Sequence, residues 1–450
     1  MYFLKITMAK IKHDLNTLFN SKSIAIIGAS SNPKKVGYAL LKNLINSKAN
    51  IFPINPKHDK ILNKKCYKNV LSISENIDTA IIAVPKIIVE KVLKECGEKK
   101  VKNVIIISSG YKEVGDIISE NKLKSICEKY KMNLIGPNCL GVMNTSNKMN
   151  ASFFNGLPKK GKISFVSQSG ALGVGILDYF IKKGFGLSKF ISIGNMAGIN
   201  FCDVIEYLIK DKETSVICLY IESLKEGKRF MKLAKKSDKP IIVLKGGKSS
   251  EGSKAVSSHT GSMAGSKEIY EFAFKQAQVI SAKTLTELFD KALLIEKQGY
   301  NKKGRKTCII TNAGGPGILT TDYCEENKLV LPKLPEKIIR ELNNFLPKAW
   351  SHHNPIDIVG DALAERYEKC FKTMAKCKLF ENYIIILTPQ TMTEPFKTAE
   401  KIIEFKKNLE KNTRVVACFI GGEKVEKAKE YLINNGIPCF DEPLRCVRSL

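Results

Sequence analysis

Residues 23–37 have the sequence SIAIIGASSNPKKVG, in which an aliphatic run passes directly into a turn of small residues. The run that ends at Ile27 is continuously apolar, which is typical of a strand buried on both faces of a parallel sheet. The turn begins at Gly28, and residues 36–46 follow with the spacing of an amphipathic helix. A strand, a turn and a helix in this order open a βαβ unit, so the stretch predicts an α/β fold.

The alternation of short apolar strands with helical segments continues through the whole chain. A second unit opens at Gly161 and a third near Lys306, each with a small-residue turn between its first strand and first helix. We therefore predict three doubly wound domains, residues 1–150, 151–300 and 301–450, the last two being copies of one architecture. The predicted strands span residues 23–27, 49–53, 79–84, 104–108, 133–135, 162–166, 189–193, 216–221, 240–244, 307–310, 383–387 and 415–420.

The net charge of +29 is the most prominent feature of the composition. Such an excess suggests nucleic acid as a partner, but only seven of the 73 basic residues are arginine. Proteins that contact bases and phosphates favour arginine, because its planar guanidinium binds in a bidentate manner. The lysines are scattered along the chain, as on a solvated surface. We therefore predict no nucleic-acid partner, whereas steering of small anionic ligands by this charge is expected.

The cysteine pattern argues against a disulfide framework and against a zinc site. The chain has 13 cysteines, an odd number, and no CxxC pair. Several lie in apolar strands, among them Cys218, Cys308 and Cys418, and are expected to be small buried hydrophobic residues in a reducing cytoplasm. No apolar run approaches the ~20 residues of a membrane span. The N-terminus lacks the pattern of a signal peptide, and no metal ligands accompany His352 and His353.

The strand ends of the first domain carry motifs that favour an anionic ligand. Backbone amides at a helix start attract phosphate, as the turn after Ile27 would allow. This turn is not GxGxxG and no acidic residue ends the second strand, so a nicotinamide cofactor is disfavoured. The other strand ends carry INPK (54–57), AVPK (83–86), SSGYKEVG (108–115) and GPNCLG (136–141). Ligands of open α/β sheets bind beyond such ends, although each motif taken singly also fits an ordinary turn.

Taken together and in this order, these motifs resemble the CoA-binding domain of the succinyl-CoA synthetase α subunit and of ADP-forming acyl-CoA synthetases. The resemblance implies a Rossmann-like CoA-binding domain followed by two flavodoxin-like doubly wound domains. It also implies CoA-binding roles for residues at the matching positions. These are Gly28, Ala29, Ser30, Lys35, Gly37, Pro56, Lys57, Val84, Pro85, Ser108, Glu113 and Asn138.

In the second domain, the segment Ser167-Gln168-Ser169-Gly170 leads into a helix. By itself it fits either a capped helix or a phosphate site at a helix N-terminus. In the family, the matching helix stabilises a phosphorylated histidine through its dipole. The resemblance therefore makes all four residues candidates for phosphate binding.

The candidate for that histidine is His259, which lies among small and hydroxyl residues in AVSSHTGSMAG (255–265). These neighbours leave room for a phosphoryl group and a mobile loop, and a neutral imidazole is nucleophilic near pH 7. A lone loop histidine is more often merely exposed, but this string resembles the phosphohistidine loop of the family. We expect Ser258, Thr260 and Gly261 to contact the phosphate.

Glu222 falls at the end of a predicted strand, where it could accept a hydrogen bond from one imidazole nitrogen. A surface glutamate would fit the position equally, but in the family a glutamate at a matching position holds the catalytic histidine. Gly194, Asn195 and Asp203 also resemble a family stretch that lines this site. In the third domain, NAGGPG (312–317) is interpreted mainly as structure and subunit contact, although it too meets a helix start.

The resemblance implies the α subunit of an ADP-forming acyl-CoA synthetase, with acetyl-CoA the first expectation although no motif identifies the acyl group. An acyl phosphate forms from acyl-CoA and phosphate, His259 takes the phosphoryl group, and ADP receives it. We find no ATP-grasp domain in the sequence, so a separate β subunit is expected to hold ADP or ATP and Mg²⁺, in an α₂β₂ assembly. A piece of a fused enzyme would show the same features. The alternatives are a CoA-binding regulatory or scaffold protein without turnover, and a nucleic-acid binder.

Overall fold

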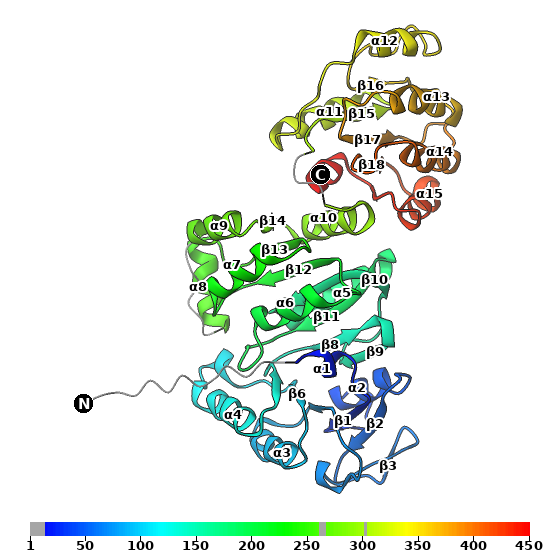
Figure 1. The fold of residues 1–450 in the computed structure, drawn as a ribbon. Helices are drawn as coiled ribbons and strands as arrows, with labels where there is room; N and C mark the ends of the chain where they lie inside the picture. Colours follow the sequence, from blue (N-terminus) through cyan, green and yellow to red (C-terminus); the bar gives the residue numbers. More distant parts are fainter. Residues whose placement is uncertain (1–13, 261–266, 301–303) are drawn as a thin grey trace, which may run out of the picture. The chain divides into compact units, whose positions relative to one another are not determined.

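The computed structural model describes residues 14–260, 267–300 and 304–450, with the side chains of 257–260 left out. The described residues up to Ala282 form one compact unit, and those from Lys283 onward form a second. The described part of the first unit contains two large sheets and a two-stranded ribbon, and that of the second unit one large sheet (Figure 1).

The first sheet of the first unit is parallel, with the strand order β2-β1-β5-β6-β7. The order runs outward from β1 in both directions, which defines a doubly wound sheet with a crevice at the carboxyl ends of its strands. The strands are β1 (Ser23–Ile27), β2 (Asn50–Ile54), β5 (Thr79–Ile82), β6 (Asn103–Ile106) and β7 (Asn133–Ile135). The other elements are α1 (Asn16–Phe19), α2 (Val36–Leu44), α3 (Lys86–Glu98), α4 (Ile117–Tyr130), η1 (Val70–Ser72), η2 (Lys112–Val114) and the ribbon of β3 (Lys60–Ile61) and β4 (Lys64–Lys65).

Alternating residues of β1 face opposite sides of this sheet, because side chains alternate along a strand. Ile24 and Ile26 share one apolar cluster with the leucines of α2. Ala25 and Ile27 share another cluster with residues of α3 and α4, including Leu93. Helices therefore cover both faces, as the continuously apolar run predicts.

The second sheet has the order β14-β13-β12-β10-β11-β8-β9. Five strands are parallel, whereas β8 pairs antiparallel with β11 and with β9. The strands are β8 (Gly141–Asn144), β9 (Met149–Ser152), β10 (Lys159–Ser167), β11 (Gly186–Ser192), β12 (Val216–Ile221), β13 (Ile241–Lys245) and β14 (Ile280–Ala282). The helices are α5 (Gly170–Lys183), α6 (Phe201–Lys210), α7 (Gly227–Lys236), α8 (Ser250–Thr260) and α9 (Lys267–Gln276), with η3 (Thr145–Asn147) between β8 and β9.

The hairpin of β8 and β9 ties the two sheets of the first unit together. It spans the domain limit expected near residue 150, and its strand β8 is hydrogen-bonded to β11 of the second sheet. One apolar cluster continues from Ile24 and Leu40 beside the first sheet to Ile191 and Leu219 in the second. This shared core explains why residues up to Ala282 form a single unit.

The second unit is built on a parallel sheet with the order β16-β15-β17-β18-β19. It begins with α10 (Leu285–Gln298). Gln298 donates from Nε2 to the Val415 carbonyl at 2.7 Å and accepts from the Val415 amide at 2.9 Å, so α10 is bound to this sheet. The strands are β15 (Thr307–Thr311), β16 (Ile356–Asp357), β17 (Asn382–Leu387), β18 (Arg414–Phe419) and β19 (Cys439–Phe440). The other helices are α11 (Gly314–Glu326), α12 (Glu336–Asn343), α13 (Ala364–Ala375), α14 (Pro395–Lys407), α15 (Glu423–Asn434) and α16 (Pro443–Ser449).

Crossing a bilayer needs about 20 consecutive apolar residues in a helix. The longest helices in the described part of the chain, among them α4 and α5, have 14 residues. None of the helices described is long and apolar enough to span a membrane.

All thirteen cysteines are buried and free, which confirms the prediction for Cys218, Cys308 and Cys418. Burial raises the pKa of Cys139 and of Cys370 to about 12, because the thiolate loses its hydration. Only about one such thiol in 10⁴ is ionised at pH 8, and the thiolate is the reactive form. We expect dithionitrobenzoate to modify almost none of the thirteen thiols in the native protein at pH 8, and all of them in denaturant. Rapid stoichiometric labelling of the native protein would contradict this burial.

Candidate functional site

A cavity of about 840 Å³ lies in the first unit, where the ends of β5 and β6 face the start of α5. Its wall is drawn from both sheets, and it includes seven residues that the sequence analysis selected. These are Val84, Pro85, Ser108, Asn138, Gln168, Ser169 and Gly170. The remaining lining residues are Val36, Ala83, Lys86, Ile107, Ser109, Cys139, Leu140, Phe153, Ala171 and Val174. Residues predicted for CoA and residues predicted for phosphate thus line one cavity.

Close backbone contacts at the turn between β1 and α2 hold the start of α2 at the cavity wall. Gly28 has φ +93°, and a Cβ there would lie 2.3 Å from the Ala83 carbonyl oxygen. A Cβ on Gly37 of α2 would lie 1.9 Å from the Gly28 carbonyl oxygen. Only glycine allows these approaches, and they bring the first turn of α2, with Val36, to the cavity wall.

The other residues of this turn and of the neighbouring strand end are not among the lining residues. Ala29 and Ser30 are buried, and Asn55 Nδ2 donates to the Ala29 carbonyl at 2.8 Å, joining the turn to the end of β2. Lys35 is the exposed N-cap residue of α2. Pro56 and Lys57 are exposed just after β2. Lys35 and Lys57 therefore lie at the same edge of the sheet as the cavity but do not line it.

Two strand ends form the floor of the cavity. Ser108 Oγ donates to the Val84 carbonyl at 2.5 Å, which couples the loops after β5 and β6. Pro85 is the N-cap residue of α3. Both Pro85 and Lys86, the first residue of α3, line the cavity. The Lys86 Nζ is 2.5 Å from Asp116 Oδ2, the N-cap residue of α4.

Glu113, for which a CoA contact stays a prediction, makes several hydrogen bonds within the protein. Its carboxylate accepts hydrogen bonds from the amides of Gly110 and Tyr111 and from Asn195 Nδ2. Burial acts to raise the pKa of Glu113, but these hydrogen bonds outweigh it and hold the pKa below its usual value. Asn195 Oδ1 also accepts from Asn138 Nδ2 at 3.3 Å. Glu113 and Asn195 thus brace the loop beside the cavity wall.

The start of α5 presents backbone donors to the cavity. Ser169 is the N-cap residue, and its Oγ accepts from the Leu172 amide at 3.3 Å. Ser167 Oγ donates to the Ser169 carbonyl at 2.7 Å, fixing the turn. The first amides of a helix have no partner inside it, and the helix dipole favours an anion there. Gly170 and Ala171, both in the wall, belong to this first turn.

Glu222 follows β12 directly, as predicted, and is 6% exposed. Gln168 Oε1 accepts hydrogen bonds from the amides of Glu222 and Ser223, both at 3.0 Å, and Gln168 Nε2 donates to Ser223 Oγ at 3.1 Å. Gln168, predicted to bind phosphate, therefore uses its side-chain amide to hold the Glu222 turn. Burial, the Glu222 charge and a hydrogen bond with Glu222 raise the pKa of Tyr220 to about 12.

The segment around His259 is helical, where the sequence analysis expected a loop. The backbone of Ser258, His259 and Thr260 forms the last turn of α8, and α8 contacts η2 of the first sheet. The helix is favoured by Glu251 in its first turn and by Val256, which packs on Gly247. The side chains of Ser258, His259 and Thr260, and Gly261 altogether, lie outside the described residues. The contact with η2 places α8 beside the loop that contains Glu113.

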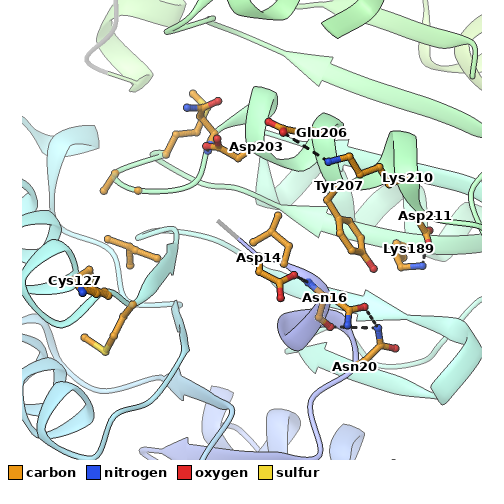
Figure 2. A pocket seen from close by; sticks show the side chains of 18 of the residues that line it. Asp14, Asn16, Asn20, Cys127, Lys189, Asp203, Glu206, Tyr207, Lys210 and Asp211 are labelled. Carbon is orange, nitrogen blue, oxygen red and sulfur yellow. Dashed lines mark hydrogen bonds and ion pairs between the residues drawn. The ribbon is translucent and has the colours of Figure 1, made fainter. Parts of the chain in front are cut away.

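Asp203 does not lie at this cavity, contrary to the expectation from the sequence. It forms a capping box with Asn200 at the start of α6, and its Oδ1 is 2.7 Å from Arg229. It lines a larger cavity of about 1890 Å³ in the same unit, shown with Lys189 and Asp211 in Figure 2. Eight basic and seven acidic side chains line that cavity. Because their charges nearly balance, it does not favour a polyanion.

The segment from Asn312 to Gly317, interpreted mainly as structure and subunit contact, joins two strand ends of the second unit. Asn312 Nδ2 donates to the Thr388 carbonyl at 2.9 Å, joining the ends of β15 and β17, and α11 begins at Gly314. No group of three or more histidine, cysteine, aspartate or glutamate side chains suited to a metal ion occurs among the described residues, His352 and His353 included.

Three protein-family models match successive parts of the chain. A CoA-binding domain matches residues 22–145, a succinyl-CoA ligase like flavodoxin domain residues 160–295, and a ligase-CoA domain residues 307–445. The predicted fold class, a CoA-binding domain followed by flavodoxin-like domains, is confirmed by these matches together with the parallel sheets.

Among proteins of known name, the chain is similar to the α subunit of acetate–CoA ligase [ADP-forming] II from Pyrococcus furiosus. The two are 44% identical over 95% of this chain and 95% of that subunit. It is also 42% identical to acetate–CoA ligase [ADP-forming] I from Archaeoglobus fulgidus, over 97% of this chain but only 63% of that longer protein. The chain therefore spans less than two thirds of one relative and nearly all of the other.

A solved structure supports the likeness in three dimensions. It is the dinucleotide-forming acetyl-coenzyme A synthetase 1 of Ca. Korarchaeum cryptofilum in complex with phosphate and ADP, with a TM-score of 0.91 and 34% identity. The match covers 97% of this chain and 95% of that chain.

Proposed function

Because the chain belongs to the family of ADP-forming acetate–CoA ligases, we propose that it acts as the α subunit of such a ligase. It would convert acyl-CoA, ADP and phosphate into the acid, ATP and CoA, with acetyl-CoA as the first substrate to test. The single observation that carries the proposal is the 840 Å³ cavity, in which the CoA motifs and the amide donors of α5 meet.

The proposed reaction has three displacements. A phosphate oxygen attacks the acyl carbon of the thioester, the carbon–sulfur bond breaks, and CoA leaves as a thiolate that takes up a proton. A neutral ring nitrogen of His259 then attacks the phosphorus, the bond to the acyl oxygen breaks, and the carboxylate leaves. Finally an oxygen of the terminal ADP phosphate attacks the phosphorus and the nitrogen–phosphorus bond breaks, giving ATP.

Each proposed role follows from the position of a group on this chain. The first amides of α5 would stabilise the phosphate charge, since preorganised donors at a helix start need little reorganisation. Glu222 would accept a hydrogen bond from one nitrogen of His259 and leave the other as the nucleophile. The net charge of +29 would draw CoA, phosphate and ADP, which are all anions, toward the protein.

We further propose that a partner chain binds the nucleotide and Mg²⁺ through an ATP-grasp domain, in an α₂β₂ assembly. Supporting this division, the chain matches almost the whole length of a named α subunit but only 63% of a longer relative. Thirteen free thiols agree with a reducing cytoplasm as the place of work. A CoA-binding scaffold without turnover is the second candidate, favoured only by the cavity itself.

Filling the cavity tests the CoA site. Ser109 is exposed and lines the cavity, so Ser109→Trp adds bulk there without disturbing a buried side chain. We expect the affinity for CoA, measured by isothermal titration calorimetry, to fall by about 10-fold or more. Ser74→Trp is the matched control. Ser74 is also an exposed serine of the CoA-binding domain, but it does not line the cavity. Equal CoA affinity in Ser109→Trp and wild type would contradict the assigned site.

A further inference from the structure

Lys245 is a buried charged group that the proposed reaction does not use. It is the last residue of β13, directly beside β12, and is 4% exposed. Its Nζ donates to the Glu222 carbonyl at 2.9 Å and to the Gly246 carbonyl, and lies 4.6 Å from the centre of the Tyr270 ring. The ion pairs of the described residues include none at this nitrogen, although the charge of Glu222 favours its protonated form. Burying an ammonium group without an ion-pair partner is costly, which calls for a reason.

The two neighbours of Glu222 in the sheet hold its backbone from opposite sides. The amide of Glu222 donates to Gln168 Oε1, at the end of β10, and its carbonyl accepts from Lys245, at the end of β13. Both holding side chains are buried, Gln168 being 7% exposed. The direction of a side chain depends on the position of its backbone. Gln168 and Lys245 therefore fix the direction in which the Glu222 side chain points beyond the strand.

Lys245 also connects Glu222 with the helix that carries His259. The Gly246 carbonyl, its second acceptor, belongs to a glycine turn that ends at α8. Ser253 Oγ in α8 donates to the Gly247 carbonyl at 3.2 Å, and the turn rests on Tyr220, whose Oη would lie 2.7 Å from a Cβ on Gly246. The hydrogen bonds of Lys245, the backbone from Gly246 to Gly247 and the bond from Ser253 therefore link Glu222 to α8.

We propose that Lys245 is a positioning residue for phosphoryl transfer. It fixes the position of the Glu222 backbone, at the end of β12, relative to the glycine turn that leads into α8, the helix of His259. This inference rests on the proposed function, because it assigns Glu222 and His259 their roles. Burial lowers the pKa of Lys245 to about 8, which agrees with an amine kept for its hydrogen bonds rather than for contact with solvent. Lys245 itself need not touch the substrate.

The test uses Lys245→Met, which keeps the length of the side chain but removes its donors, and Lys245→Arg, which keeps donors. In the full complex with the ATP-grasp partner, we expect Lys245→Met to lower kcat by about 10- to 100-fold. The KM for acyl-CoA should stay within about twofold, since the cavity is untouched. Lys245→Arg should recover a large part of the lost kcat.

Lys239→Met is the matched control, at the opposite end of the same strand. Lys239 Nζ also donates to two backbone carbonyls, those of Leu208 (2.7 Å) and Asp211, but far along β13 from Glu222. We expect Lys239→Met to lower the melting temperature without the drop in kcat. If both methionine variants lower kcat equally, or neither does, the positioning role is wrong.

Amide hydrogen exchange separates this inference from the function on which it rests. In Lys245→Met, and not in Lys239→Met, the amides of Glu222, Ser223 and residues 246–249 should exchange about 10-fold faster. If the wild-type complex makes no ATP, the proposed function fails while the exchange data still decide whether Lys245 holds the two segments. Unchanged exchange in Lys245→Met would overturn the inference even if the enzyme is active.

Discussion

We expect the replacement of His259 by asparagine to abolish ATP formation from acetyl-CoA, ADP and phosphate, with a loss of at least about 1000-fold in kcat. Asparagine keeps a polar side chain of similar size but has no nitrogen lone pair that can accept a phosphoryl group. Without a covalent carrier, the acyl phosphate cannot pass its phosphoryl group on to ADP. The measurement is the steady-state rate of ATP production by the complex with its ATP-grasp partner.

His353→Asn is the control for a general effect of losing a histidine. His353 is exposed in the second unit and no described metal group includes it. We expect this variant to retain the wild-type rate, and both variants to retain the wild-type circular dichroism spectrum. A His259→Asn complex that still makes ATP at more than a tenth of the wild-type rate would exclude His259 as the phosphoryl carrier and favour the scaffold alternative.

Gly37→Ala is expected to destabilise the first unit by about 3 kcal/mol and to weaken CoA binding. The added Cβ would lie 1.9 Å from the Gly28 carbonyl oxygen, an impossible contact that only a backbone shift can relieve. Such a shift moves α2 away from the β1 turn and displaces the cavity wall at Val36. In thermal unfolding we expect the midpoint to fall by roughly 6–10 °C, and CoA titration should show a parallel loss of affinity.

Gly175→Ala is the matched control, because Gly175 also lies in a helix, α5, but no atom lies within 4 Å of a Cβ added there. Alanine favours a helix over glycine, so this variant should be as stable as wild type or more stable by up to about 1 kcal/mol. If the two variants unfold at the same temperature, the close approach of α2 to the β1 turn is not as the structure describes.

Much of the fold could be predicted from the sequence, because its long strands are buried on both faces. Continuous apolar runs are sufficient to find β1 and β12, whose bounds match the predicted ranges. The short strands β16 and β19, with two residues each, give no such signal and exist only because the neighbouring strand pairs with them. The hairpin of β8 and β9 joins the second sheet by long-range pairing with β11, which local pattern does not reveal.

The position of the candidate site could be predicted better than the contacts of its residues. Turns at strand ends converge because parallel strands present their carboxyl ends at one edge, and Val84, Ser108 and Asn138 indeed line the cavity. The hydrogen bonds that Glu113 and Gln168 make within the protein could not be predicted, since a residue that binds a ligand and one that holds a neighbouring loop can be of the same type. The contacts that distinguish them connect residues that lie 82 and 54 positions apart.

Lys245 was missed for a related reason. A lysine after the apolar run of β13 looks like the exposed end of a strand, and the sequence holds 73 basic residues. Its burial follows from the glycines at 246 and 247, which let the turn fold back over it, and from the ring of Tyr270. A charged residue between an aliphatic run and two glycines is the signal that could have singled it out.

Trapping the phosphorylated protein tests the central claim most directly. The complex is incubated with acetyl-CoA and radiolabelled phosphate in the absence of ADP, quenched in alkali and digested, and the label is mapped to a peptide. We expect stoichiometric, acid-labile and alkali-stable phosphate on the peptide that contains His259, and its complete transfer to ADP when ADP is added. Absence of protein-bound phosphate, or phosphate that maps to another residue, would contradict the account.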